Sequence, residues 1–314
     1  MLPDVIAVSF NSGPDVARCI ASILENGGNP LVVDNGSTDE TLQIIAAGFP
    51  EVRVLHNPLN GYARAANLGL RNTTSKIALV CNADVTFPSG AIRALTEFLE
   101  RRPKIGVLGA QQVYPDGSWQ RSWGLATGVT EVLVEACGFT SLRNGLRKVL
   151  WPRQLNCRAI EVGYIDGAMM AIRRAAFDSV GGFDERFPFS SEDTDFCMRV
   201  RQRGWRVSVL PTVSVIHRRG GSTDRLNWTA EAKIATFLRG TNMLLAKRHG
   251  ALFRKFYFQC KRLSNFNMAV LCQMISWIAP ARFREELKRK EQVHRIYVDQ
   301  LGSLRFGDSF PLAS

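Results

Sequence analysis

The first 115 residues alternate between short apolar runs and amphipathic stretches. The apolar runs predict buried strands at 5–10, 31–33, 52–55, 77–81 and 105–113. The stretches between them repeat their apolar residues three and four positions apart, which predicts helices, most clearly at 62–70 and 88–101. Strands that alternate with helices in this way predict an α/β fold, with a mostly parallel sheet flanked by helices.

The second part of the chain is less regular. Residues 119–158 give no clear element, whereas 168–172, 205–210 and 213–216 predict strands and 192–203 predicts a helix. From Asn227 onward the pattern is helical. We therefore expect one α/β domain over 1–226, built from the halves 1–115 and 116–226, followed by a helical region over 227–314.

The positive charge is concentrated near the end of the chain. The whole chain carries +12, and the segment from Met243 to Gln300 has twelve cations and four carboxylates, a net of +8. One interpretation is a solvated helical face. Another is a surface for anionic lipid, because five apolar residues are interleaved with these cations: Leu252, Phe253, Phe256, Tyr257 and Phe258. No nucleic-acid recognition motif accompanies the charge, so we expect no nucleic-acid partner.

Cysteine spacing and hydropathy indicate a cytoplasmic protein. The seven cysteines never occur as CxxC, which argues against a disulfide framework or a structural zinc site. The first residues contain Asp4 and no basic segment, so no signal peptide is expected. The longest apolar run in the second half, 266–280, has 15 residues, whereas a spanning helix needs roughly 20.

Three polar clusters follow predicted strands, at Asn11, at 34–39 and at 82–84. Ligands of parallel α/β sheets bind beyond the carboxyl ends of the strands, so three clusters on one edge predict a site. Asp84 is suited to hold Mg²⁺ or Mn²⁺ through oxygen, although a single Asp after a strand is more often part of a turn. Ser37 and Glu40 also have the spacing of a capping box for the next helix.

Two further groups carry candidate chemistry. A predicted helix N-terminus carries three acidic residues, Glu192, Asp193 and Asp195. Acidic residues at this position commonly serve as helix caps. Neighbouring carboxylates also raise one another's pKa, however, which suits a general base. His217 follows a strand and precedes cationic and hydroxyl residues, which suits a metal and diphosphate site, although a surface histidine is commoner. The signatures of P-loop, dinucleotide-binding, GxSxG and HExxH proteins are missing from the sequence.

Taken in order, these segments resemble the family 2 glycosyltransferases, which are inverting enzymes of the GT-A fold, and especially bacterial rhamnosyltransferases. The matching motifs are VSFNS at 8–12, VDNGSTD at 33–39, NGYARAANLG at 60–69, LVCNAD at 79–84, GGFDE at 181–185, SEDTD at 191–195 and HRRGGS at 217–222. Each motif is weak, but seven in the same order are specific. The resemblance covers roughly residues 4 to 250.

The resemblance implies a role for each matching position. The half 1–115 would bind the nucleotide, with its pocket lined by Ser9, Asn11, Asp34 and Asn35 and its wall shaped by Asn60, Gly61 and Asn67. Asn82 and Asp84 occupy the place of the family's DxD motif, with Asn82 replacing the first carboxylate. The metal ligands would be Asp84 and His217. Asp193 matches the general base, and the acceptor site in the half 116–226 would include Asp166, Gly167 and Glu192.

The resemblance also implies an activity: transfer of a sugar from a nucleotide sugar, with dTDP-L-rhamnose as the expected donor and Mg²⁺ or Mn²⁺ as the metal. The implied acceptor is a lipid-linked or growing cell-surface glycan, and the implied location is the inner face of the plasma membrane. One alternative is a sugar nucleotidyltransferase, but the loop at 11–15 lacks the cations that such an enzyme needs. Another is a non-catalytic scaffold that binds glycan or lipid, although Asp84, Asp193 and His217 are all present.

Overall fold

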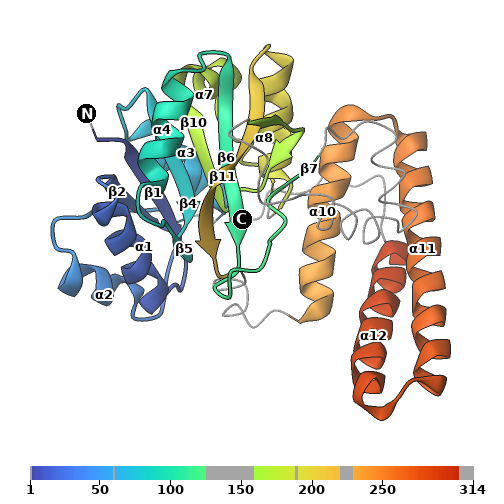
Figure 1. Ribbon diagram of the computed structural model, residues 1–314. Coiled ribbons are helices and arrows are strands. Elements are labelled where there is room, and N and C mark those ends of the chain that lie inside the picture. Colours follow the sequence, from blue (N-terminus) through green and yellow to red (C-terminus); the bar gives the residue numbers. More distant parts are fainter. Residues whose placement is uncertain (1, 59–60, 125–158, 188–189, 220–228, 304–314) are drawn as a thin grey trace. The chain divides into compact units, whose positions relative to one another are not determined.

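The computed structural model describes residues 2–58, 61–124, 159–187, 190–219 and 229–303 (Figure 1). The chain forms two compact units, and the second contains the last three helices. The elements of the first unit are β1 (Asp4–Ser9), α1 (Pro14–Glu25), β2 (Asn29–Asp34), α2 (Thr41–Gly48), β3 (Arg53–His56), α3 (Tyr62–Arg71), β4 (Ile77–Asn82), β5 (Val85–Thr86), α4 (Ala91–Glu100), β6 (Ile105–Val113), β7 (Trp123–Gly124), β8 (Ile160–Glu161), β9 (Tyr164–Ile165), β10 (Met169–Arg173), α7 (Arg174–Val180), α8 (Glu192–Gln202) and β11 (Arg206–His217).

Nine strands of the described residues form one mixed sheet in the order β3-β2-β1-β4-β10-β6-β11-β5, with β8 paired to β11. The strands from β3 to β4 are mutually parallel, as are β6 and β11. Between these two parallel groups lies β10, which runs antiparallel to both of its neighbours, β4 and β6. The α/β prediction is confirmed, and the antiparallel β10 is a feature that periodicity did not reveal.

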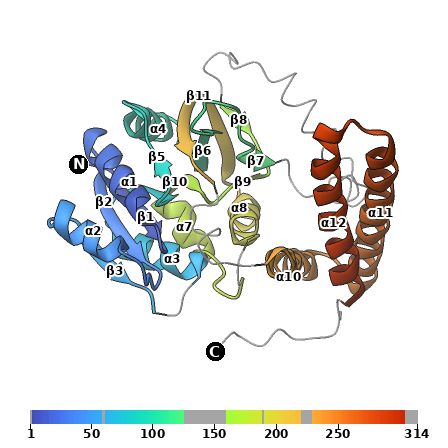
Figure 2. The ribbon, with the colours of Figure 1, turned by 90° about the horizontal axis from the view of Figure 1, so that it is seen from below.

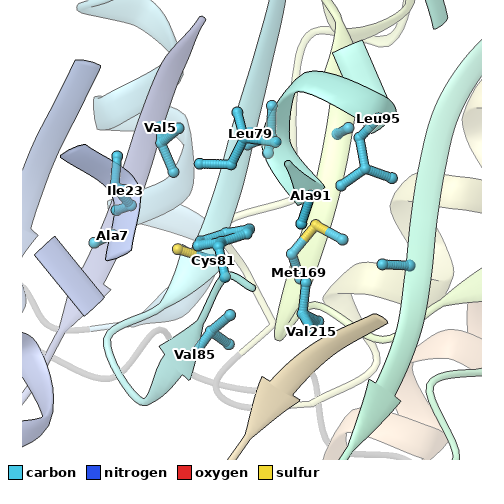
Figure 3. Packing of buried hydrophobic residues seen from close by; sticks show 14 of the residues in the cluster. Val5, Ala7, Ile23, Leu79, Cys81, Val85, Ala91, Leu95, Met169 and Val215 are labelled. Carbon is cyan, nitrogen blue, oxygen red and sulfur yellow. The ribbon is translucent and has the colours of Figure 1, made fainter. Parts of the chain in front are cut away.

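Alternation along the buried strands divides the core into two layers. Val5 and Ala7 of β1 pack with α1, α2 and α4 on one face, which Figure 3 shows from close by. Ile6 and Val8 point to the other face, where α3, α7 and α8 lie (Figure 2). On that face Gly69 of α3 lies so close to β1 that an added Cβ would collide with Ile6. Both faces of the sheet are therefore covered by helices.

Two local predictions are corrected by the structure. The two strands predicted at 205–210 and 213–216 form a single strand, β11. Its pairing with β6 shifts register between Leu210 and Ser214, next to Pro211, which has no N–H to donate to a neighbouring strand. Ser37 and Glu40 do not form a capping box, because the Ser37 hydroxyl accepts from the N–H of Asn11 and no side chain caps at Glu40. Asp39 Oδ1 instead accepts from the N–H of Thr41, at 3.0 Å.

The second unit contains α10 (Ala230–Arg248), α11 (Ala251–Ile278) and α12 (Ala281–Ser303), so the helical prediction for this region is confirmed. Tyr257 and Phe258 are buried with Leu238 and Leu301 in its core, and Phe253 packs against them. The interpretation that the aromatic residues near 253–258 face lipid is therefore wrong for Tyr257 and Phe258. A helix with the length and apolarity needed to cross a membrane was not found in the described part of the chain.

Candidate active site at the carboxyl edge of the sheet

Asp34, the last residue of β2, is buried, and its two carboxylate oxygens have different surroundings. Its Oδ2 accepts from the backbone N–H groups of Gly36 and Ser37, at 3.2 and 3.1 Å, which fixes the loop that follows the strand. Its Oδ1 is buried and has no hydrogen-bond partner in the protein. A buried acceptor of this kind normally has a partner, so Asp34 Oδ1 suits an N–H group of a ligand.

The other residues predicted for the nucleotide pocket hold this edge in shape. Asn11 has φ +44° and accepts from the N–H of Thr38 at 2.7 Å, which joins the loop after β1 to the loop after β2. Ser9 is fully buried and donates to the hydroxyl of Ser12 at 3.1 Å. The side-chain oxygen of Asn35 accepts from the amide of Asn57 at 2.6 Å. These side chains are thus brought together next to Asp34.

The NGYARAANLG motif forms the start of α3. Gly61 precedes the helix with φ +119°, a conformation that favours glycine, while Asn60 lies outside the described residues. Asn67 is buried and its amide contacts the distant GGFDE motif: Nδ2 donates to the carbonyl of Phe183 at 2.9 Å, and Oδ1 accepts from the Phe183 N–H at 2.8 Å. Asn67 therefore ties α3 to the loop before α8.

Asp84 and His217 meet through the short strand β5. Val85 pairs with His217 in the antiparallel ladder between β5 and β11, and the Arg218 N–H donates to the Asp84 carbonyl at 3.2 Å. The pairing places His217 Nε2 at 3.4 Å from Asp84 Oδ1, with both side chains about 5% exposed. Asn82 ends β4, and its N–H donates to the carbonyl of Ala168 at 3.0 Å.

Two glutamines determine which nitrogen of His217 carries the proton. Gln120 donates its amide N–H to the His217 carbonyl at 3.1 Å, so its oxygen faces Nδ1, at 2.7 Å. The side-chain oxygen of Gln112 also lies 3.0 Å from Nδ1. Because the Gln120 oxygen is an acceptor, Nδ1 carries a hydrogen, and Nε2 is the nitrogen that faces Asp84.

This pair of atoms has the chemistry of a cation site. His217 Nε2 lies 3.4 Å from Asp84 Oδ1, which has no hydrogen-bond donor in the protein, and a carboxylate oxygen and a neutral imidazole nitrogen are both ligands for a cation. Two cis ligands of an octahedral Mg²⁺ lie about 3 Å apart, close to this separation. No cluster of three or more metal-binding side chains occurs within the described ranges. Asp84 and His217 would supply an oxygen and a nitrogen ligand to a divalent ion.

A cluster of carboxylates lies at the N-terminus of α8. Asp193 accepts from the N–H of Gly167 at 2.9 Å and from the N–H of Thr194 at 2.6 Å. Burial, followed by the nearby Asp166 charge, raises the pKa of Asp193 to about 6. Burial and then the Asp193 charge raise the pKa of Glu192 to about 8, and Glu192 Oε2 has no hydrogen-bond partner in the protein. At neutral pH the cluster thus combines a proton acceptor with a protonated neighbour.

The peptide segment 166–168 joins three parts of the edge. The Gly167 N–H binds Asp193, the Gly167 carbonyl accepts from the hydroxyl of Tyr62 on α3, and the Ala168 carbonyl accepts from Asn82 after β4. Burial, more than the nearby acidic charges, raises the pKa of Tyr62 well above its ordinary value, so its hydroxyl remains a donor. We call this segment the 166–168 junction.

Sequence reasoning missed four residues of this arrangement: Gln112, Gln120, Tyr62 and Asp15. Gln112 was visible as one of two glutamines at the end of an otherwise apolar strand, and Tyr62 lay inside a motif already singled out. Asp15 is buried, and its carboxylate accepts a hydrogen bond from the side chain of Arg218 at 3.2 Å. Arg218 is the cationic residue that directly follows His217, so this cation is already paired within the protein. Ser222 lies outside the described residues.

Known proteins resemble this chain in sequence and in fold. Residues 4–181 match the family described as glycosyl transferase family 2. Over 279 residues the chain is 32% identical to the N-acetylglucosaminyl-diphospho-decaprenol L-rhamnosyltransferase of Mycobacterium tuberculosis, covering 80% of this chain and 86% of that protein. It is 28% identical to the pre-mycofactocin glycosyltransferase of M. tuberculosis, covering 76% of this chain and 46% of that protein.

Solved structures confirm the fold. A mannosyltransferase from Pyrobaculum calidifontis in complex with GDP-Man and Mn²⁺ has a TM-score of 0.56 at 16% identity, covering 96% of this chain and 88% of that chain. TarS from S. aureus in complex with UDP-GlcNAc has a TM-score of 0.52 at 15% identity, covering 96% and 91%. The fold is therefore GT-A. From the family match and the M. tuberculosis relative together, the chain belongs to glycosyl transferase family 2 and is a glycosyltransferase.

Proposed function

We propose that this enzyme transfers L-rhamnose from dTDP-L-rhamnose to a hydroxyl of a lipid-linked glycan, with inversion at the anomeric carbon. The observation that carries the proposal is the 166–168 junction, which binds the candidate base Asp193 through Gly167 and the candidate metal motif through Ala168. The M. tuberculosis relative supports the donor and the acceptor, because its name specifies L-rhamnose and a diphospho-decaprenol carrier. Such an acceptor would hold the reaction at the cytoplasmic face of a membrane.

The proposed chemistry assigns one task to each group. Asp193 takes the proton of the acceptor hydroxyl as that oxygen attacks the anomeric carbon and the bond to the nucleoside diphosphate breaks. Glu192, protonated at neutral pH and with Oε2 unpartnered in the protein, donates a hydrogen bond to the acceptor or the sugar. Asp84 and His217 would hold Mg²⁺ or Mn²⁺, and a bound ion would supply positive charge against the leaving diphosphate. The remaining predicted roles of Asp166, Asn67 and the pocket residues stand as part of this proposal.

The direct test is transfer of sugar to a polyprenyl-diphospho-N-acetylglucosamine acceptor from a panel of dTDP-, UDP- and GDP-sugars, with Mg²⁺ or Mn²⁺. We expect dTDP-L-rhamnose to give product with the inverted anomeric configuration, observed by NMR of the released glycan. Turnover of another donor would correct the sugar assignment, and binding of donors without turnover on any acceptor would favour the non-catalytic alternative.

A substitution at Asp34 tests how the pyrimidine is recognised. Asp34→Asn keeps one oxygen for the Gly36 and Ser37 N–H groups but replaces the unpartnered Oδ1 with an NH₂ group. Thymine presents N3–H, so two donors would face each other, and we expect dTDP to bind about tenfold or more weakly by calorimetry. Cytosine has an acceptor at N3, so CDP should lose no affinity. Equal losses for dTDP and CDP would contradict the assignment.

The pH profile of kcat/KM tests the base. Only the ionised carboxylate of Asp193 accepts a proton, so the rate should fall as the pH drops through about 6, and not near the ordinary aspartate value. Asp166→Asn removes a charge that raises this pKa, so the acid limb should move to lower pH even if the overall rate also falls. An acid limb near pH 4 in the wild type, or one that Asp166→Asn leaves unmoved, would oppose the assignment.

A further inference from the structure

The C-terminal half of α11 is apolar and exposed. No charged residue occurs from Leu263 to Ala281, a run that ends at the turn between α11 and α12. The most exposed large apolar residues of this end are Trp277, at 74%, and Ile278, at 85%, and Met274 and Phe283 are also exposed. Toward α12, α11 buries only small side chains here: Ala269, Cys272 and Ser276.

This end of the second unit is far from the unit's own core. α11 and α12 pack as an antiparallel hairpin, since His294 lies 2.9 Å from Asn265 and Gly302 lies beside Arg262. The buried aromatic core involves α11 only up to Cys260. Eighteen further residues at 1.5 Å per residue place Ile278 about 27 Å along the helix from Cys260. The apolar side chains at the turn are therefore not part of that core.

Positively charged residues are frequent immediately after the turn, at the start of α12. Five cations and two carboxylates lie between Arg282 and Lys290, a net of +3. Arg282 lies over the ring of Phe283, at 4.7 Å from its centroid, and Arg284 donates to the carbonyl of Ala279 at 3.2 Å. A groove of about 470 Å³ opens at the same end, and its lining is apolar except for Glu286 and Lys290, which form an ion pair at 2.7 Å; the apolar residues are Ile275, Ile278, Ala279, Pro280, Phe283 and Leu287.

We propose that this hairpin tip, formed by Met274, Trp277, Ile278, Pro280 and Phe283, inserts into the boundary between headgroups and acyl chains of an anionic membrane. Exposed apolar patches mark interaction surfaces, and Trp with neighbouring Arg and Lys is the combination found at membrane interfaces. Cations close to an anionic leaflet are attracted to its surface, and this attraction adds to the burial of the apolar side chains. A second copy of the chain would instead bring two surfaces of the same positive sign together, so charge favours lipid as the occupant.

The proposed insertion involves a different part of α11 from the residues that the sequence indicated, which are Leu252, Phe253, Phe256, Tyr257 and Phe258. It deepens the proposed function, because a polyprenyl-linked acceptor lies in the same membrane. Binding of the tip to lipid nevertheless requires neither donor nor acceptor, so it is measured independently of transfer.

The test is co-sedimentation of the full chain with vesicles of phosphatidylcholine mixed with phosphatidylglycerol, and with vesicles of phosphatidylcholine alone. We expect binding to the anionic vesicles that weakens about 10²-fold in the double variant Trp277→Ser/Ile278→Ser, because two large apolar side chains no longer enter the membrane. The matched control is Leu252→Ser/Phe256→Ser, which removes two exposed apolar residues from the other end of the same helix. It should bind like the wild type.

Two further measurements make the outcome decisive. Trp277 fluorescence, taken as the difference between the wild type and Trp277→Phe, should be quenched by brominated lipid in anionic vesicles. Far-UV circular dichroism checks that the variants are folded. Equal loss in both double variants, no loss in the tip variant, or concentration-dependent dimers that only the tip variant lacks would each overturn the proposal. Should transfer fail while vesicle binding persists, the proposed function falls and the membrane site stands.

Discussion

Replacing Asp193 with asparagine should lower the rate of sugar transfer by about 10²–10⁴-fold while leaving nucleotide-sugar binding unchanged. Asparagine can still accept from the N–H of Gly167 or Thr194, so α8 should begin as before. It cannot take the proton of the acceptor hydroxyl, so only the chemical step should suffer. Single-turnover transfer and calorimetric binding of the donor separate these two effects.

Glu192→Gln is the matched comparison for Asp193→Asn. Burial and the Asp193 charge raise the pKa of Glu192 to about 8, so this residue is largely protonated at neutral pH. Glutamine is similarly neutral and still donates a hydrogen bond, and we therefore expect a much smaller loss of rate. If Glu192→Gln were as damaging as Asp193→Asn, or Asp193→Asn were nearly as active as the wild type, Asp193 would not be the base.

Asp84→Ala should abolish the dependence on divalent metal and lower transfer by about 10²–10³-fold, the loss typical when a group that stabilises transition-state charge is removed. Asp84 Oδ1 has no hydrogen-bond donor in the protein, so its removal breaks no hydrogen bond at that atom. The measurement is Mn²⁺ affinity by electron paramagnetic resonance in the presence of dTDP, together with transfer rates across a metal titration.

Gln120→Ala provides a graded control in the same experiment. Gln120 does not reach the cation position itself but orients His217 through two contacts, so Mn²⁺ affinity should fall by about 10–100-fold, less than in Asp84→Ala. Higher metal concentration should restore transfer in Gln120→Ala but not in Asp84→Ala. Wild-type Mn²⁺ affinity in Asp84→Ala would remove this carboxylate from the proposed metal site.

The sequence was sufficient to predict the sheet and its helices because both faces of the sheet are buried. Strands covered on both sides are continuous apolar runs, as in 5–10 and 77–81, and the helices between them show a clear apolar stripe. The antiparallel β10 was recognised as a strand, but its direction depends on the path of the preceding residues, which periodicity does not encode. The boundary at 226 stays a prediction.

The site was only partly predictable, since its key contacts depend on weak local signals. Asp84 and His217 meet because β5, a strand of two residues, pairs with the end of β11, and two residues have no periodicity to detect. Gln120 contacts His217 from a stretch that gave no clear element. On α11, the sequence showed aromatic residues interleaved with cations but could not show that Tyr257 and Phe258 are buried in the core of the helical unit.

Under the proposed roles, the 166–168 junction would limit how this enzyme can change its substrate. Tyr62 donates to the carbonyl of Gly167, and Asp193 accepts from the N–H of the same residue. A shift of Tyr62 that fits a new donor would therefore also displace the proposed base, so donor preference and turnover would not be independent traits. Variants selected for a new sugar nucleotide should carry their substitutions at other positions of the pocket and retain both Tyr62 and Gly167.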